Sequence, residues 1–173
     1  MIENEREIRE RLAVEAAHQM MIAARTAPKG KGVDVIEAAL ITGDDLATLA
    51  DRMQAMGEER GMRFFHRDAE NVRVAQCVLL IGTREKAQGL NCGHCGFPTC
   101  AARSEGVPCA INVVDVGIAL GSACSKAADL RLDTRVMFSA GLAAEDLDIL
   151  AGCTQVYAIL VSISSKSPFF DRK

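Results

Sequence analysis

The sequence predicts an α+β fold, and three observations support this prediction. Segments with helical periodicity alternate with apolar runs typical of buried strands, and a cysteine-rich stretch without a sustained period interrupts them. The 173 residues suffice for one domain, whose core must be mainly aliphatic because the chain has one Tyr and no Trp. We expect a single domain over residues 1–173, with an inserted metal-binding segment at about 90–110.

The first third of the chain predicts two helices with a strand between them. A helix is expected over 4–26, where apolar residues recur on one stripe, and Pro28 and the glycines after it end the helix. The stripe consists of Ile8, Leu12, Ala16 and Met20. Residues 33–42 are compatible with a short strand, although their centre fits a helix equally well. The Thr42-Gly-Asp-Asp run is a good helix start, and this second helix should continue to Gly57.

The middle of the chain predicts a buried strand followed by a long loop. Residues 61–71 are mixed and charged, and no element is predicted there. Residues 72–82 begin with alternation and become continuously apolar, as the central strand of a sheet does. Residues 83–110 concentrate Gly, Pro and Cys, so we expect a loop that is held by something other than its own core.

The last third predicts a buried helix and a second buried strand. Small and apolar residues over 111–130 indicate a helix whose Gly117 and Gly121 should permit close packing. A short helix is expected at 143–150, and an apolar run at 155–164 predicts the strand.

Charge and composition exclude several classes of protein. The chain carries 20 Lys and Arg against 23 Asp and Glu, a formal net charge of −3, which offers no basic field for nucleic acid. Its charged start, Met1-Ile-Glu-Asn-Glu-Arg-Glu, lacks a secretory signal, and no apolar run approaches membrane-spanning length. We expect a cytoplasmic protein with neither a nucleic-acid nor a membrane partner.

Four of the seven cysteines lie within eighteen residues, in the order C-x2-C-x4-C-x8-C. They are Cys92, Cys95, Cys100 and Cys109. In a reducing compartment such a group more often binds metal than forms disulfides. Four thiolates saturate a [4Fe-4S] cluster, which needs one thiolate per iron, and Gly93 and Gly96 allow the tight turns around it. We predict that these four cysteines ligate such a cluster.

Two alternatives stay open at this motif. Four thiolates also bind zinc, and C-x2-C is half of a typical zinc site, so a zinc-stabilised structural or interaction module without redox activity is the alternative function. The three remaining cysteines, Cys77, Cys124 and Cys153, lie in apolar surroundings and are expected to be small buried hydrophobes. The sequence contains no acid–base pair or nucleophile constellation that would identify an enzyme, a substrate or a reaction.

The Cys-Gly-His-Cys-Gly-Phe-Pro-Thr-Cys run resembles that of an uncharacterised prokaryotic family of ferredoxin-domain-containing proteins. The resemblance extends over most of the chain, including Ala23-Ala-Arg-Thr-Ala-Pro-Lys-Gly and the run Asp115-Val-Gly-Ile-Ala-Leu-Gly. It implies an iron-sulfur protein that transfers electrons to a redox partner protein or a small-molecule acceptor.

A second resemblance, to the flavin nitroreductases, is carried by Ala23-Ala-Arg-Thr-Ala-Pro, by Leu46-Ala-Thr-Leu-Ala and by Asp115-Val-Gly-Ile-Ala. It implies nitroreductase-like helices around a mixed sheet, a homodimer, and FMN as a second candidate cofactor. The chain departs from that family because Lys29-Gly-Lys-Gly stands where nitroreductases contact the flavin. A cationic glycine loop exposes charge and backbone donors, so Arg25, Lys29 and Lys31 are candidates for binding the flavin phosphate, and a solvated loop is the alternative.

Overall fold

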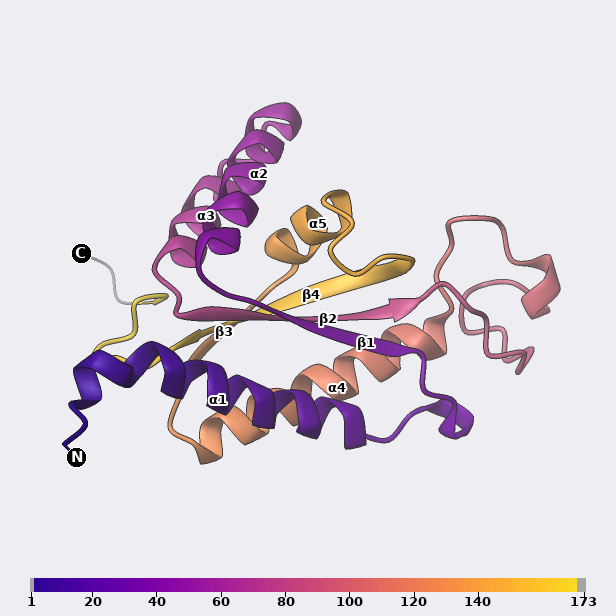
Figure 1. Cartoon of the computed structure of the whole chain (residues 1–173). Helices are drawn as coiled ribbons and strands as arrows, with labels where there is room; N and C mark the ends of the chain where they lie inside the picture. Colours follow the sequence, from indigo (N-terminus) through magenta and orange to yellow (C-terminus); the bar gives the residue numbers. More distant parts are fainter. Residues whose placement is uncertain (1, 171–173) are drawn as a thin grey trace.

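A four-stranded sheet separates two layers of helices in the computed structural model, which describes residues 2–170 (Figure 1). In chain order, the elements are α1 (Glu5–Thr26), the 3-10 turn η1 (Gly30–Gly32), β1 (Ile36–Ile41), α2 (Asp44–Arg60), α3 (Phe64–Arg73), β2 (Cys77–Arg84), the 3-10 turn η2 (Cys100–Ala102), α4 (Ala110–Asp129), β3 (Asp133–Met137), α5 (Phe138–Asp146) and β4 (Cys153–Ser162). The predicted α+β class is confirmed.

The strand order is β1-β2-β4-β3, and every pair of neighbours is antiparallel. The expectation of a mixed sheet is wrong within residues 2–170, and the connections between the strands explain why. The two helices α2 and α3 pack against each other between β1 and β2. They return the chain to the end of the sheet that it left, so β2 runs back along β1. The α4 crossover joins β2 to β3, but β4 lies between those two strands.

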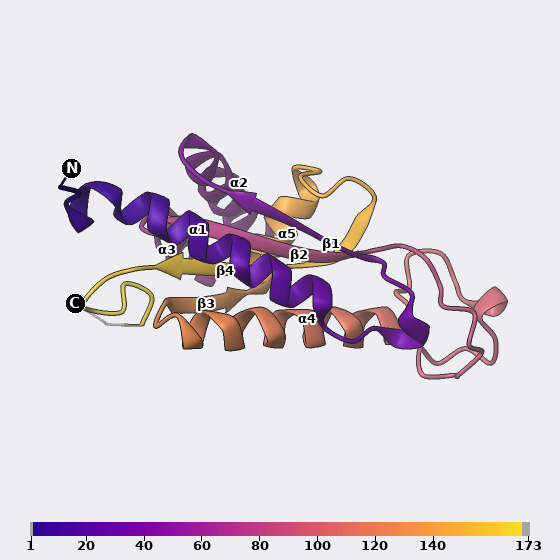
Figure 2. The same cartoon turned by 60° about the horizontal axis from the view of Figure 1, so that its bottom comes forward.

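Helices cover both faces of the sheet (Figure 2), and a separate hydrophobic core lies on each face. Helices α1 and α4 lie side by side on one face, where small side chains such as Ala17 and Ala123 allow close approach. Helices α2, α3 and α5 cover the other face, around the fully buried Phe65. The continuous apolar run in β2 fits this arrangement, because a central strand covered on both faces has no wet side.

Several predicted elements are confirmed, and others need correction. The expected helices over 4–26 and 111–130 match α1 and α4, and the final strand matches β4. Helix α3 was not predicted, because its buried side chains, including Phe65, Ala69 and Val72, stand among charges. Strand β2 begins at Cys77 rather than at 72, and α5 covers 138–146 rather than 143–150. Strand β3 had no predicted counterpart.

Helix α4 is less enclosed than its sequence predicts. A side chain added at Gly117 or Gly121 would meet nothing within 4 Å, so these glycines face open space rather than a close helix contact. Within residues 2–170, α4 alone is long and apolar enough to cross a membrane, judged by length and composition. Its other face carries the buried Ala119, Ala123 and Ala127, as in the core helix of a globular domain.

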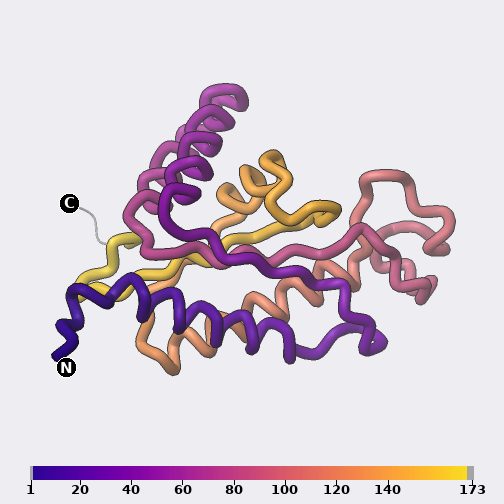
Figure 3. Tube along the Cα trace, viewed as in Figure 1, coloured from indigo at the N-terminus to yellow at the C-terminus, as the bar shows by residue number. Residues whose placement is uncertain are grey.

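The long loop after β2 projects beyond one end of the sheet (Figure 3). It covers 85–109 and contains η2, and the first turn of α4 follows it directly. The short turn η1 lies at the same end of the molecule, whereas α1 begins at the opposite end (Figure 1). The fold therefore places the cysteine loop and the Lys29-Gly-Lys-Gly turn together.

Candidate metal centre

The cysteine loop, residues 85–109, turns at positions that favour glycine. Gly93 and Gly96 have φ angles of 73° and 87°, in the left-handed region where a side chain is strained. Asn91, just before the first cysteine, adopts a φ of 50°. The turning freedom expected of the two glycines is therefore used between the first three cysteines.

The four thiols occupy different environments in this loop. Cys92 is exposed, whereas Cys95, Cys100 and Cys109 are half-buried. Cys100 begins the short turn η2, and Cys109 is the N-cap residue of α4. Among residues 2–170, no three His, Cys, Asp or Glu side chains form a group arranged to hold a metal ion. The predicted ligand set therefore stays a prediction, and the loop must bring the four sulfurs together to bind a metal.

Asn91 links the two ends of the three-cysteine segment. Its backbone N–H donates to the Cys100 sulfur at 3.4 Å, and its side-chain oxygen accepts from the backbone N–H of Cys100 at 2.8 Å. Hydrogen bonds from amides to sulfur are among the interactions that tune thiolate-bound clusters. The donor chemistry of the loop, with four thiols and an amide already directed at one of them, thus fits an iron-sulfur centre.

The surroundings of Cys109 favour its thiolate form. Burial acts to raise its pKa, but backbone N–H groups of Gln88, Asn112 and Ile111, with the charge of Arg103, outweigh that effect and lower the pKa. These amides include the open N–H groups of the first turn of α4, where a helix favours negative charge. Cys109 is therefore suited to act as a thiolate ligand.

Buried amide side chains close the base of the loop, and the sequence analysis did not identify them. The Gln88 amide donates to the Asn112 side-chain oxygen at 2.8 Å, and Asn112 donates to the carbonyl of Lys86 at 2.6 Å. Lys31 donates from η1 to the carbonyl of Gln88 at 3.0 Å. The sequence around Gln88 does not show that it pairs with Asn112, 24 positions later. A polar Asn in the first turn of an apolar helix could nevertheless have indicated a buried polar contact there.

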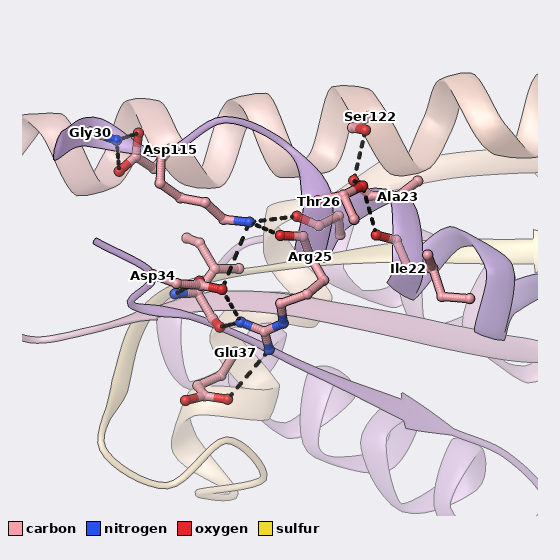
Figure 4. A network of polar contacts seen from close by, with 12 residues as sticks. Ile22, Ala23, Arg25, Thr26, Gly30, Asp34, Glu37, Asp115 and Ser122 are labelled. Carbon is pink, nitrogen blue, oxygen red and sulfur yellow. Dashed lines mark hydrogen bonds and ion pairs between the residues drawn. The ribbon is translucent and has the colours of Figure 1, made fainter. Parts of the chain in front are cut away.

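The three cations proposed for a flavin phosphate all have partners within the chain, and Figure 4 shows those of Arg25. Arg25 donates to Asp34 at 2.8 Å and to the carbonyl of Ile36 at 2.7 Å, and it lies 3.8 Å from Glu37. The buried Lys29 ammonium donates to the backbone carbonyls of Ala24 and Arg25 at the end of α1. These are structural contacts, and the phosphate role of Arg25, Lys29 and Lys31 stays a prediction.

A polar hollow of about 470 Å³ lies at the other end of the molecule, between the start of α1 and the end of β4. Its lining includes Arg6, Arg9 and Arg131 and the hydroxyl-bearing Ser164. Arg9 is paired with Glu5 at 2.7 Å. The hollow thus combines cationic groups with hydroxyls, far from the cysteine loop.

The remaining cysteines differ from the four in the loop. Burial, together with the charge of Glu10, raises the pKa of Cys77 to about 12. Burial also raises the pKa of Cys124 and is the largest effect raising that of Cys153. Cys77 is buried as expected, and the other two are half-buried. Raised pKa values keep these thiols protonated at neutral pH and so unreactive.

Comparison with known proteins gives one family and one close relative. Residues 105–172 match the family described as "Uncharacterized protein containing a ferredoxin domain (DUF2148)". That range includes Cys109 and lies after Cys92, Cys95 and Cys100. The chain is also 39% identical, over 182 residues, to an uncharacterised protein of Archaeoglobus fulgidus, a match that covers 99% of this chain and 98% of the relative.

Solved structures similar to this chain include nitroreductases with bound FMN. One from Desulfitobacterium hafniense, with bound FMN, has a TM-score of 0.62 and 14% identity, covering 88% of this chain and 78% of that chain. Another from Bacteroides fragilis, also with bound FMN, has a TM-score of 0.62 and 10% identity, covering 92% of this chain and 81% of that chain. At these identities the likeness is one of fold, and it confirms the predicted nitroreductase-like arrangement.

Proposed function

This chain belongs to the family of uncharacterised proteins containing a ferredoxin domain, and from that premise we propose that it is an iron-sulfur redox protein that transfers electrons through a [4Fe-4S] cluster. One observation carries the proposal. The loop contains four cysteines within eighteen residues, the backbone amide of Asn91 donates to the sulfur of Cys100, and the surroundings of Cys109 lower the pKa of its thiol.

In this proposal each of the four cysteines holds one iron. Cys109 is the fixed ligand because α4 positions it, and the turns at Gly93 and Gly96 allow Cys92, Cys95 and Cys100 to approach it. A bound cluster supplies one-electron chemistry, with no bond made or broken. With a cluster bound, the chain would exchange electrons with a redox partner protein or with a small-molecule acceptor. The projecting loop, in which Cys92 is exposed, supports exchange with such partners.

FMN is a second cofactor in the proposal, because similar folds contain it. Its phosphate needs cations with free donors. Lys31 is exposed at η1, where its ammonium has three donors and uses one on the Gln88 carbonyl, and Arg131 lines the hollow beside α1. The two ends of the molecule therefore offer competing sites. The proposal also includes a homodimer, which the resemblance to the nitroreductases implies.

The test is purification without oxygen, followed by visible absorption and analysis of iron, sulfide and zinc. We expect a broad band at about 400 nm that dithionite bleaches, and about four irons and four sulfides per chain. Replacing Cys92, Cys95, Cys100 or Cys109 with Ser should remove the band or convert the cluster. Cys124→Ser is the matched control, because that thiol is half-buried in the same protein and outside the loop.

Two other results have defined meanings. A colourless protein that holds one zinc per chain would replace the redox proposal with a zinc-stabilised module. Flavin bands beside the cluster band would support the second cofactor. Loss of those bands in Lys31→Met would place the phosphate at η1, and their loss in Arg131→Gln would place it in the hollow.

A further inference from the structure

Three polar side chains are buried where the cysteine loop joins the domain. Gln88, Asn112 and Asp115 are 7%, 2% and 3% exposed. Buried polar groups are costly unless hydrogen bonds satisfy them, so three of them at one place specify a particular arrangement of the chain. All three have partners on other segments.

Gln88 and Asn112 form what we call the amide clasp. Gln88 lies at the start of the loop, shortly after β2, and Asn112 lies in the first turn of α4, three residues after Cys109. The Gln88 amide donates to Asn112 at 2.8 Å, and Asn112 reaches back to the carbonyl of Lys86 at 2.6 Å. The clasp therefore bonds one end of the loop to the other.

The turn η1 reinforces the clasp from a third segment. The backbone N–H of Gly30 lies 3.0 Å from both carboxylate oxygens of Asp115, on the next turn of α4 (Figure 4). The neighbouring Lys31 then donates to the carbonyl of Gln88 at 3.0 Å. An extra side chain at Gly30 would fall within 2.5 Å of Ile111, which shows how closely η1 packs on α4.

We propose that Gln88 and Asn112 are positioning residues of the metal centre, which hold Cys109 in place and keep the two ends of the loop together. The inference rests on the proposed function, because it concerns the same loop. With both ends of the loop bonded, only the segment over 89–108 has to rearrange for the other three thiols to reach Cys109.

The experiment compares two buried asparagines. Asn112→Ala removes the clasp, whereas Asn71→Ala removes a buried Asn from α3, on the other face of the sheet. Each protein is reconstituted with iron and sulfide, and the rate of iron release to a chelator is measured, with the EPR spectrum and midpoint potential of the reduced centre. Outer-shell partners of metal ligands are typically worth about 10 to 100-fold in affinity, so we expect at least about tenfold faster release in Asn112→Ala and no change in Asn71→Ala.

A double-variant cycle separates positioning from general stability. Gln88→Met breaks the same bond from the other side, so Gln88→Met, Asn112→Ala and their combination should accelerate iron release by similar factors. Asn112→Asp keeps the shape and the acceptor for Gln88, loses the donor to the Lys86 carbonyl and adds a negative charge, which should move the midpoint potential to a more negative value. Thermal unfolding of each metal-free variant shows whether it folds, and Gln88→Met replaces Asn112→Ala if the latter does not.

Outcomes for the two proposals are distinguishable. If the unaltered protein takes up no iron and sulfide, the proposed function fails. If it holds a cluster, and the clasp variants release iron at the unaltered rate with the same spectrum and potential, the inference alone is overturned. Equal acceleration in Asn112→Ala and Asn71→Ala would also overturn it, because a general loss of stability would then explain both.

Discussion

At the residue scale, Arg25 and Lys29 make structural contacts where α1 ends and the chain leads into β1. The last carbonyls of a helix lack partners within it and carry partial negative charge, and the Lys29 ammonium satisfies two of them. Arg25 leaves the same helix end and fixes the start of β1 through Asp34 and the Ile36 carbonyl. Lys29, a candidate for binding a flavin phosphate, thus satisfies carbonyl groups that lack partners at the end of α1.

Asp34 makes this arrangement sensitive to acid. Burial acts to raise its pKa, but hydrogen bonds from Arg25 and from the backbone of Ile36, and the charges of Arg25 and Lys29, lower it overall. The contribution to stability is therefore present above the unfolded pKa of about 3.9 and is lost as pH falls through the folded value. The side chain is 37% exposed, so solvent screening limits the effect to about 1 kcal/mol.

We predict that Asp34→Asn lowers the free energy of unfolding by up to about 1 kcal/mol at pH 7, and that the difference from the unaltered protein is smaller at an acidic pH below the unfolded pKa of about 3.9. Urea unfolding at both pH values measures it. Glu58→Gln, which removes an exposed carboxylate from α2, is the control and should show little change at either pH. A difference of the same size at both pH values would rule out this ion pair as its source.

At the element scale, the contact of α5 with β4 depends on one glycine. A side chain at Gly141 would run into the backbone carbonyl of Val156, which cannot move without distorting β4. We predict that Gly141→Ala destabilises the protein by about 1–3 kcal/mol or more, as overpacking does. In contrast, Gly117 faces open space in the middle of α4, so Gly117→Ala should stabilise by about 0.5–1 kcal/mol.

Denaturant unfolding of both variants checks this pair. The two glycines are both helical, so intrinsic helix propensity favours alanine equally, and the difference between the variants isolates the contact with β4. A destabilised Gly117→Ala variant would contradict an open outer face on α4.

At this scale, the sequence predicts an element when the residues that indicate it lie within one continuous segment. Helix α1 was predictable because its stripe and its N-cap, Asn4, lie within one segment. Strand β3 was not, because an edge strand such as Asp133-Thr-Arg-Val-Met has little continuous apolar character. The cysteine spacing was visible, but the bond between Gln88 and Asn112 joins residues 24 positions apart and exists only after α4 has docked.

At the scale of the whole molecule, the residues that form the hydrophobic cores are separate from the cysteine loop. The two hydrophobic cores lie between the helices and the sheet, and neither includes a residue of 85–109. Burial of apolar surface is the main stabilising term in folding, so the two cores account for most of the stability, whatever occupies the loop. The loop is anchored to this body at its two ends, by the amide clasp and by the start of α4.

This separation predicts the effect of removing the metal. A chelator should leave the far-ultraviolet circular dichroism and the main unfolding transition nearly unchanged, and it should accelerate backbone hydrogen exchange only over about 85–109 and at η1. Exchange measured by mass spectrometry, with and without metal, tests this, and α2 serves as the internal reference because it lies on the other side of the sheet. Loss of the whole fold on chelation would mean that the metal contributes the folding free energy itself, as in small zinc domains, and that the two cores cannot sustain the structure alone.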